Sequence, residues 1–159
     1  VAWSLRVTKP QTSEFLDSSR IAVVPRGDLI SSYANSRWSD SAPVLLRNRF
    51  MDGFQRDGRV TLLSSDETNL QADYELGGQL QAFQSEYRDS AVEVVIRLDA
   101  RLVRGSDQRI IASRRFEVRQ PVSDNKVPAV VAGFGLAGDQ LNKQVVDWVV
   151  GQGNTAPKR

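Results

Sequence analysis

The chain has 159 residues, of which 40% are hydrophobic and 25% charged, with a net charge of +2, as expected of one globular domain. It contains neither cysteine nor histidine; this excludes disulfides, Cys/His zinc sites and Ser-His-Asp triads, disfavours an enzyme, and leads us to expect no catalytic residue, cofactor or metal. The arginines alternate with acidic residues and form no basic run, so we expect no nucleic-acid partner.

Strands and an aromatic loop are predicted before the first helix. Residues 4–7 (SLRV) alternate between polar and apolar side chains, and residues 21–25 (IAVVP) form a short apolar run closed by proline. Both patterns predict strands. Residues 33–43 (YANSRWSDSAP) predict a loop because they combine an aromatic pair with a polar turn. Trp3 lies at the start of the chain, where we expect it to be exposed and to cover a sheet edge.

The predicted loop contains our candidate interaction residues. We interpret Trp38 as an anchor that pins the loop to the following helix, with a binding hot spot as the alternative. The sequence leaves open whether Tyr33 and Arg37 also face a partner. If substitution of Trp38 abolishes folding, the residue is an anchor; if it abolishes only binding, the residue belongs to an interface.

A helix and a further strand follow this loop. Ser39 or Asp40 can cap the helix, Pro43 is tolerated in its first turn, and Gly58 ends it. Apolar residues recur on a helical period at Ala42, Leu45, Leu46, Phe50 and Phe54. Residues 60–63 (VTLL) predict a strand. The order strand, helix, strand suggests a right-handed crossover between parallel neighbours.

The second half predicts an antiparallel meander at residues 73–83, 92–103 and 109–118, where apolar and polar residues alternate. The inward faces are Tyr74, Leu76, Leu80 and Ala82; then Val92, Val94, Ile96, Leu98, Ala100 and Leu102; then Ile110, Ala112, Phe116 and Val118. Gly77 and Gly78 interrupt the first strand and predict a bulge or a close backbone approach.

The hairpin between the last two strands has a predicted register. Leu102 and Ile110 share a face only if the loop has an odd number of residues, because a slip of one residue inverts every side chain. A loop of three residues at positions 105–107 meets this condition. Arg114 is then the charged residue that points inward.

The C-terminal segment predicts a helix over residues 128–151. Its apolar stripe consists of Val130, Phe134, Ala137, Leu141, Val145 and Trp148. The glycines of GFGLAG fall inside this helix, where they favour close approach to a sheet or to a neighbouring subunit over a phosphate loop. Gly133, Gly135 and Ala137 are therefore our candidate subunit-contact face.

These elements define the predicted architecture. We expect a single domain over residues 1–151 and a polar, disordered tail over residues 152–159. The fold class is α/β or α+β, with a mixed sheet of about five strands, a C-terminal antiparallel meander and two long amphipathic helices packed on the sheet.

The acidic residues offer a weak catalytic alternative. Asp66 and Glu67 lie in SSDETN, whose composition is typical of a loop or a helix cap, and Asp73 and Glu75 form a second pair. Solvated turn acids are the better interpretation of Asp66 and Glu67. A carboxylate-dependent hydrolase would need two of these four acids to converge in a cleft.

Across nearly its whole length the sequence resembles the auxiliary lipoprotein components of bacterial ABC-type transport systems. The resemblance is to those that accompany mammalian-cell-entry (MCE) lipid transporters in particular. The matching segments are RIAVVP (20–25), YANSRWSDSAPVLL (33–46), ADYELGGQLQAF (72–83), the paired strands 92–104 and 109–120, and AGFGLAGDQLNKQVVDWV (132–149).

This resemblance implies a non-catalytic periplasmic domain of a Gram-negative bacterium. An N-terminal lipid, attached upstream of Val1, would anchor it to the outer or, less favoured, the inner membrane. Its partners would be the MCE substrate-binding protein or the ABC permease complex, and some relatives assemble into rings, so a homo-oligomer is also expected. The alternative is a structural or assembly lipoprotein of the outer membrane that is not coupled to a transporter, and the third hypothesis is the hydrolase.

Overall fold

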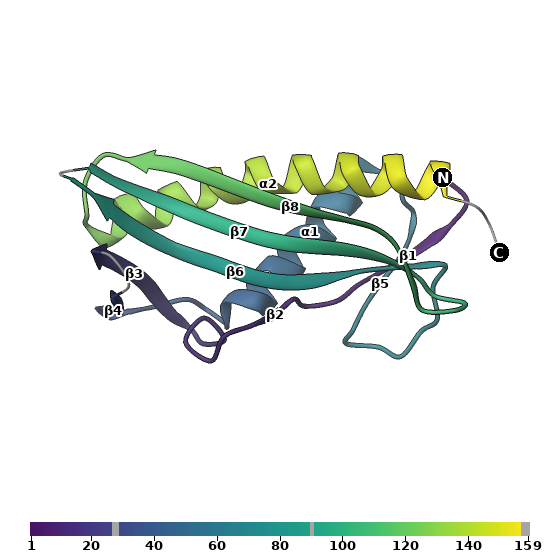
Figure 1. Ribbon diagram of the computed structural model, residues 1–159, viewed down its shortest axis with the longest axis horizontal. Helices are drawn as coiled ribbons and strands as arrows, with labels where there is room; N and C mark the ends of the chain where they lie inside the picture. Colours follow the sequence, from purple (N-terminus) through teal and green to yellow (C-terminus); the bar gives the residue numbers. More distant parts are fainter. Residues whose placement is uncertain (27–28, 90, 157–159) are drawn as a thin grey trace.

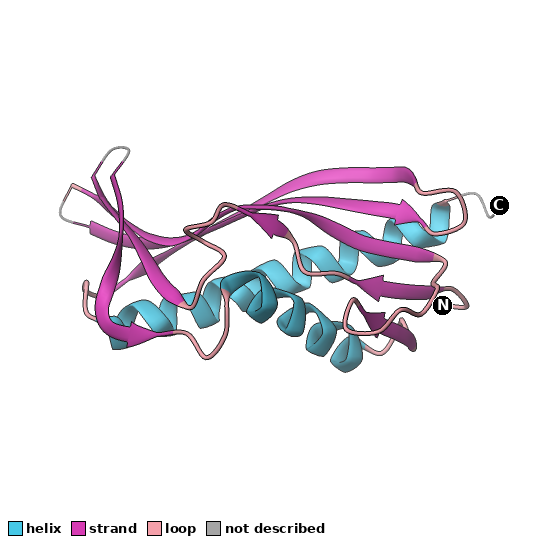
Figure 2. Ribbon diagram, turned by 90° about the horizontal axis from the view of Figure 1, so that it is seen from below, coloured by secondary structure: helices cyan, strands magenta, loops and turns pink. Residues whose placement is uncertain are grey.

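One mixed sheet packs against two helices along the length of an elongated molecule (Figures 1 and 2). The computed structural model describes residues 1–26, 29–89 and 91–156. The strands are β1 (Ser4–Val7), β2 (Gln11–Thr12), β3 (Arg20–Arg26), β4 (Leu29–Arg37), β5 (Leu62–Ser65), β6 (Tyr74–Arg88), β7 (Ala91–Arg104) and β8 (Arg109–Val122); the helices are α1 (Ala42–Asp57) and α2 (Val127–Thr155). The predicted class, a single mixed α/β domain with two helices, is confirmed.

The sheet is organised around β6. Along one edge of β6 the short strands β1, β2 and β3 follow one another, all parallel to it. Its other edge pairs with β7, which pairs with β8, so β6, β7 and β8 form the predicted antiparallel meander. Within the described residues the sheet has 8 strands instead of about five, because several short strands share one edge of β6.

The predicted crossover is wrong, and part of the predicted aromatic loop is a strand. β3 pairs antiparallel with β4, so residues 29–37 form a hairpin arm instead of a loop. After α1 the chain enters β5, which pairs parallel with β1. β3 and β5 are therefore not neighbours. The polar sequence of β4 hides its strand character because only one of its edges is paired, and Asn35 interrupts it with a φ of 61°.

The first helix follows the prediction closely. Ser41, one residue after the predicted caps, takes the extended N-cap conformation, and Gly58 ends the helix in the left-handed conformation with φ 80°. The amide of Gly58 donates to the carbonyl of Phe54 at 3.1 Å. The predicted stripe is buried except for Leu45, which is half-buried, and Arg47 is an unpredicted buried member of this face.

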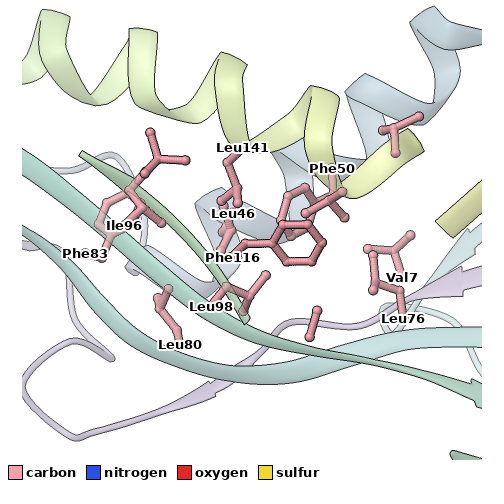
Figure 3. Packing of buried hydrophobic residues seen from close by; sticks show 14 of the residues in the cluster. Val7, Leu46, Phe50, Leu76, Leu80, Phe83, Ile96, Leu98, Phe116 and Leu141 are labelled. Carbon is pink, nitrogen blue, oxygen red and sulfur yellow. The ribbon is translucent and has the colours of Figure 1, made fainter. Parts of the chain in front are cut away.

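A β-bulge in β6 changes the predicted face of this strand. Leu80 pairs with Leu98 but Ala82 pairs with Arg97, so Gln81 is an extra residue. Phe83 consequently joins the core under the helices, where Figure 3 shows it beside Ile96, and the placement of Ala82 on that face is wrong.

The glycine pair of β6 allows a close backbone approach, which is the second of the two roles predicted for it. Gly78 has a φ of 151°, and a Cβ there would lie 2.1 Å from the carbonyl oxygen of Asp99. Close backbone approach of β7 therefore requires glycine at this position.

The hairpin between β7 and β8 has a longer loop than predicted. Arg104 pairs with Arg109, which leaves four residues, 105–108, in the turn. Ile111 is then an extra residue in β8, so Ala112 returns to the core face while Ile110 is 58% exposed. Arg114 pairs with the buried Ala100 and stacks over the Phe116 ring at 4.8 Å, so it lies on the helix-facing side as predicted, but its side chain is exposed.

The second helix continues beyond its predicted end. α2 runs to Thr155, so residues 152–155 of the predicted tail are helical, and 157–159 lie outside the described residues. Trp3 explains this extension: it is only 6% exposed, its ring lies against Gly153, and its indole N–H donates to Asn154 Oδ1 at 3.0 Å. Trp3 is therefore a core residue and not an exposed cover. Among the described residues, no helix is long and apolar enough to cross a membrane.

Candidate interaction site around Trp38

Trp38 connects the β3–β4 hairpin to the helical layer. Its ring meets Phe134 edge-on at 4.9 Å and Phe83 at 5.7 Å, measured between ring centroids. Its backbone N–H donates to the carbonyl of Ser19 at 2.6 Å, and the side chain is half-buried. These are the contacts expected of an anchor, although the anchoring role itself stays a prediction.

Beside Trp38 lies a cavity of about 380 Å³, which we call the Trp38 pocket. The sheet contributes two apolar side chains to this cavity, and α1 and α2 contribute most of its other lining residues. Its lining residues are Trp38, Ser39, Leu45, Leu46, Arg49, Phe83, Ile96, Val131, Phe134, Gly135 and Gly138. The cavity is thus mainly apolar, with few polar groups.

Ser39 and Arg49 are the polar residues of the lining besides Trp38. The indole N–H of Trp38 is buried and has no hydrogen-bond partner among the described residues. Arg49 extends from α1 to α2, where its Nη1 donates to the carbonyl of Gly135 at 3.3 Å and to the carboxylate of Asp139 at 3.2 Å. Glycine at position 138 leaves room for the Arg49 side chain, because a Cβ there would lie 2.6 Å from Nη1 of Arg49.

Tyr33 points inward from β4. Its hydroxyl forms a hydrogen bond of 2.7 Å with Ser85, which is fully buried on β6. Burial raises the pKa of Tyr33 to about 12; Tyr87 adds to this increase, whereas the bond to Ser85 opposes it. The hydroxyl therefore stays protonated near neutral pH and binds within the domain.

Arg37 faces outward and opposes another arginine. It pairs in register with Arg20 of β3, and both residues are exposed. In the described part of the chain neither forms an ion pair. Both line a shallow hollow of about 180 Å³ together with residues 32–36. Like charges placed directly opposite one another repel, so this arrangement is a local concentration of positive charge.

The predicted small-residue face does not form one surface. A Cβ on Gly133 would lie 2.3 Å from Val122, and Ala137 is fully buried, so both residues face the sheet of their own chain. Gly135 lies elsewhere, in the wall of the Trp38 pocket. Gly133 therefore serves the other predicted purpose, close approach of the helix to the sheet. Gly133 and Ala137 are buried within the chain and do not form a subunit-contact face with Gly135.

Two of the candidate acids hold a buried arginine. Arg47, with a side chain only 8% exposed, pairs with Asp66 at 2.8 Å and with Glu67 at 3.6 Å. Asp66 also accepts the backbone N–H of Lys9 at 2.9 Å. Burial alone would raise the pKa of the Asp66 carboxyl, but this N–H and the guanidinium outweigh it, and the pKa is lowered.

The other two acids also have structural partners. Asp73 accepts the backbone N–H of Ser4 at 2.8 Å, and Glu75 pairs with Arg6 at 3.1 Å. The described residues contain no group of three or more acids that could hold a metal ion. This arrangement gives the hydrolase hypothesis no support.

Comparison with known proteins identifies the family. Residues 1–146 match the family described as ABC-type transport auxiliary lipoprotein component. The chain belongs to this family. A protein from Bradyrhizobium diazoefficiens is 30% identical to this auxiliary lipoprotein component over 149 residues, which make up 92% of the chain but only 39% of that relative's length.

Solved structures agree with this family assignment. The crystal structure of protein XCC0632 from Xanthomonas campestris is 32% identical, with a TM-score of 0.91, over 97% of this chain and 87% of that one. PelC from Paraburkholderia phytofirmans, crystallised as a dodecamer, is 12% identical with a TM-score of 0.52, over 87% of this chain and 84% of its own. The second likeness extends to the fold alone.

Sequence reasoning missed two arginines of the auxiliary lipoprotein component. Arg47 had a detectable signal, because it lies three residues before Phe50 and seven before Phe54, on the apolar stripe of α1. Arg49 had no such signal: its position in the pocket depends on how α1 crosses α2.

Proposed function

We propose that this chain is the periplasmic domain of a non-catalytic lipoprotein that serves an MCE-type ABC lipid transport system as an accessory and tethering component. An N-terminal lipid would anchor it to the outer membrane. The observation that carries this proposal is the family match over residues 1–146, supported by the likeness to XCC0632 along nearly the whole chain.

The shape of the domain supports a tethering role. The N-terminus and the C-terminal end of α2 lie at one end of the elongated molecule, and β3 and β4 lie at the other (Figure 1). A lipid attached upstream of Val1 would therefore direct the hairpin away from the anchoring membrane. A partner that extends from the opposite membrane would meet the hairpin first.

The outward charge of this hairpin indicates what the partner would present. Arg37 and Arg20 carry guanidinium groups without ion-pair partners among the described residues, so an acidic surface would complement them. In this proposal an acidic surface of the MCE protein or of the permease contacts this end of the domain.

Self-association is a separate part of the proposal. PelC, which shares the fold, was crystallised as a dodecamer, and a ring of this domain would present many copies of the hairpin to one partner. Such a ring would have to use surfaces other than Gly133 and Ala137, which are buried within the chain.

The test is co-purification of the full-length lipoprotein, extracted from its own membranes in mild detergent, with the MCE protein and the permease. Arg37→Glu is the diagnostic variant. It places a carboxylate opposite Arg20, so the domain should fold at least as well as before, whereas association should weaken about tenfold.

Arg109→Glu is the matched control. Arg109 is also exposed and also stands opposite an arginine, Arg104, although it lies 4.0 Å from Asp107. It begins β8 next to the β7–β8 turn, at the same end of the molecule as the N-terminus (Figure 1). It should leave association unchanged. Recovery of an outer-membrane assembly machine in place of transporter subunits would favour the assembly alternative, and recovery of neither would refute the accessory role.

A further inference from the structure

We propose that the Trp38 pocket binds a single-chain anionic amphiphile, with its alkyl chain between the helices and its carboxylate or phosphate head at Arg49. The accessory role proposed above requires only contacts between proteins, so this ligand site goes beyond it. The inference comes from the shape and the chemistry of the pocket.

The pocket offers an apolar chain a nearly continuous surface. Leucines of α1, aromatic rings of Phe83 and Phe134, and the side chains of Ile96 and Val131 line it. Its volume of about 380 Å³ lies within the range of small-molecule sites, which is about 300–1,000 Å³. A single side chain inserted by a protein partner would fill only part of this space, whereas a flexible alkyl chain can follow it.

Glycine keeps this cavity open. Gly135 lines the pocket, and a Cβ built on it meets no atom within 4 Å. A larger residue would fit here without disturbing the protein, and glycine is unfavourable inside a helix. Packing within the domain therefore does not require glycine at position 135, and a larger side chain there would project into the pocket.

The polar groups of the pocket match an anionic head. Arg49 uses only Nη1 in its hydrogen bonds to described residues, so the N–H groups of Nε and Nη2 can bind an oxyanion. Its side chain is 41% exposed, which places the positive charge toward solvent. The indole N–H of Trp38 is fully buried and has no acceptor in the described chain, so Arg49 alone is assigned to the head group.

The experiment measures binding of a fluorescent fatty acid, dansyl-undecanoate, to the purified 159-residue chain by titration. The wild type should bind one molecule saturably. Gly135→Leu should weaken binding about tenfold or more, because leucine fills the pocket.

Gly151→Leu is the matched control. Gly151 lies on the same helix, and a Cβ there also meets no atom within 4 Å, but Gly151 does not line the pocket. This variant makes the identical chemical change and should bind the probe like the wild type. Equal thermal stability of the two leucine variants would show that the loss in Gly135→Leu comes from filling the pocket.

A second set of ligands tests the head group. Laurate and lysophosphatidylglycerol should displace the probe, and comparing the two identifies the source of the oxyanion. Methyl laurate, which has no charge, should displace it about tenfold less well. Arg49→Gln should abolish the difference between laurate and its ester.

Two results would overturn the proposal: no saturable binding by the wild type, or equal binding by Gly135→Leu and Gly151→Leu. If Gly135→Leu instead lowers co-purification with the transporter while the wild type binds no probe, the pocket is a protein-docking site and the amphiphile proposal is wrong. The binding assay contains no partner protein. Its failure is therefore distinct from failure of the accessory role, which Arg37→Glu tests.

Discussion

Trp38→Ala should destabilise the domain by about 2–3 kcal/mol, and the structure shows how this figure arises. Truncation of a fully buried tryptophan costs about 3–5 kcal/mol, but Trp38 is only half-buried. The edge-on contacts with Phe83 and Phe134 contribute about 0.5–1.5 kcal/mol each. Removal of the unpaired indole N–H returns about 1 kcal/mol, because a buried donor without an acceptor is itself destabilising.

Trp38→Phe separates these contributions. Phenylalanine keeps most of the ring contacts and removes the unpaired N–H, so its stability should lie within about 1 kcal/mol of the wild type. Urea unfolding of both variants, followed by circular dichroism, measures the two free energies of unfolding. If Trp38→Ala costs less than about 0.5 kcal/mol and yet abolishes partner association, Trp38 belongs to an interface and the anchor interpretation is wrong.

Two further predictions concern the core. The pKa of Asp66 is lowered in the folded domain, so its pair with Arg47 stabilises the fold above about pH 4 and this contribution is lost as the pH falls through the lowered pKa. Asp66→Asn should therefore cost about 2 kcal/mol at pH 7, after allowance for partial exposure, and nearly nothing in acid; a difference from wild type that does not depend on pH in urea titrations would contradict this. Gly153→Ala should destabilise by about 1–2 kcal/mol, because its Cβ would lie 2.4 Å from the buried Trp3 ring, whereas Gly151→Ala, where the space is free, should stabilise by up to about 1 kcal/mol. Thermal unfolding compares the two variants, and equal melting temperatures would show that the Trp3 ring moves freely.

The sequence predicted elements well where one face alone packs against the helices. β7 alternates over most of its length because its inward side chains lie under α1 and α2, and α1 has both an apolar stripe and a glycine stop. Two errors of side-chain orientation in the meander occur where an extra residue changes the register. Gln81 in β6 and Ile111 in β8 are such residues, and no local pattern identifies them before the partner strand is known.

The candidate site was predictable only in part. Trp38 was predicted to pin the loop to the following helix; its ring lies against Phe83 of β6 and Phe134 of α2, and its role as an anchor stays a prediction. The position of Arg49 depends on the crossing of the helices, and that of Gly135 depends on which side of α2 faces the sheet. These are properties of the tertiary arrangement, which the spacing of residues along one helix does not determine.

Quantitative mass spectrometry of the proteins that co-purify with the full-length lipoprotein from its native membranes tests both the proposed function and the proposed contact surface. We predict that the permease and the MCE protein of an ABC transport system are enriched with the wild type and with Arg109→Glu, and depleted with Arg37→Glu. Enrichment of transporter subunits that is the same in all three samples would contradict the assignment of the β3–β4 end as the contact surface. Absence of any ABC transporter subunit from all three would contradict the proposed function itself.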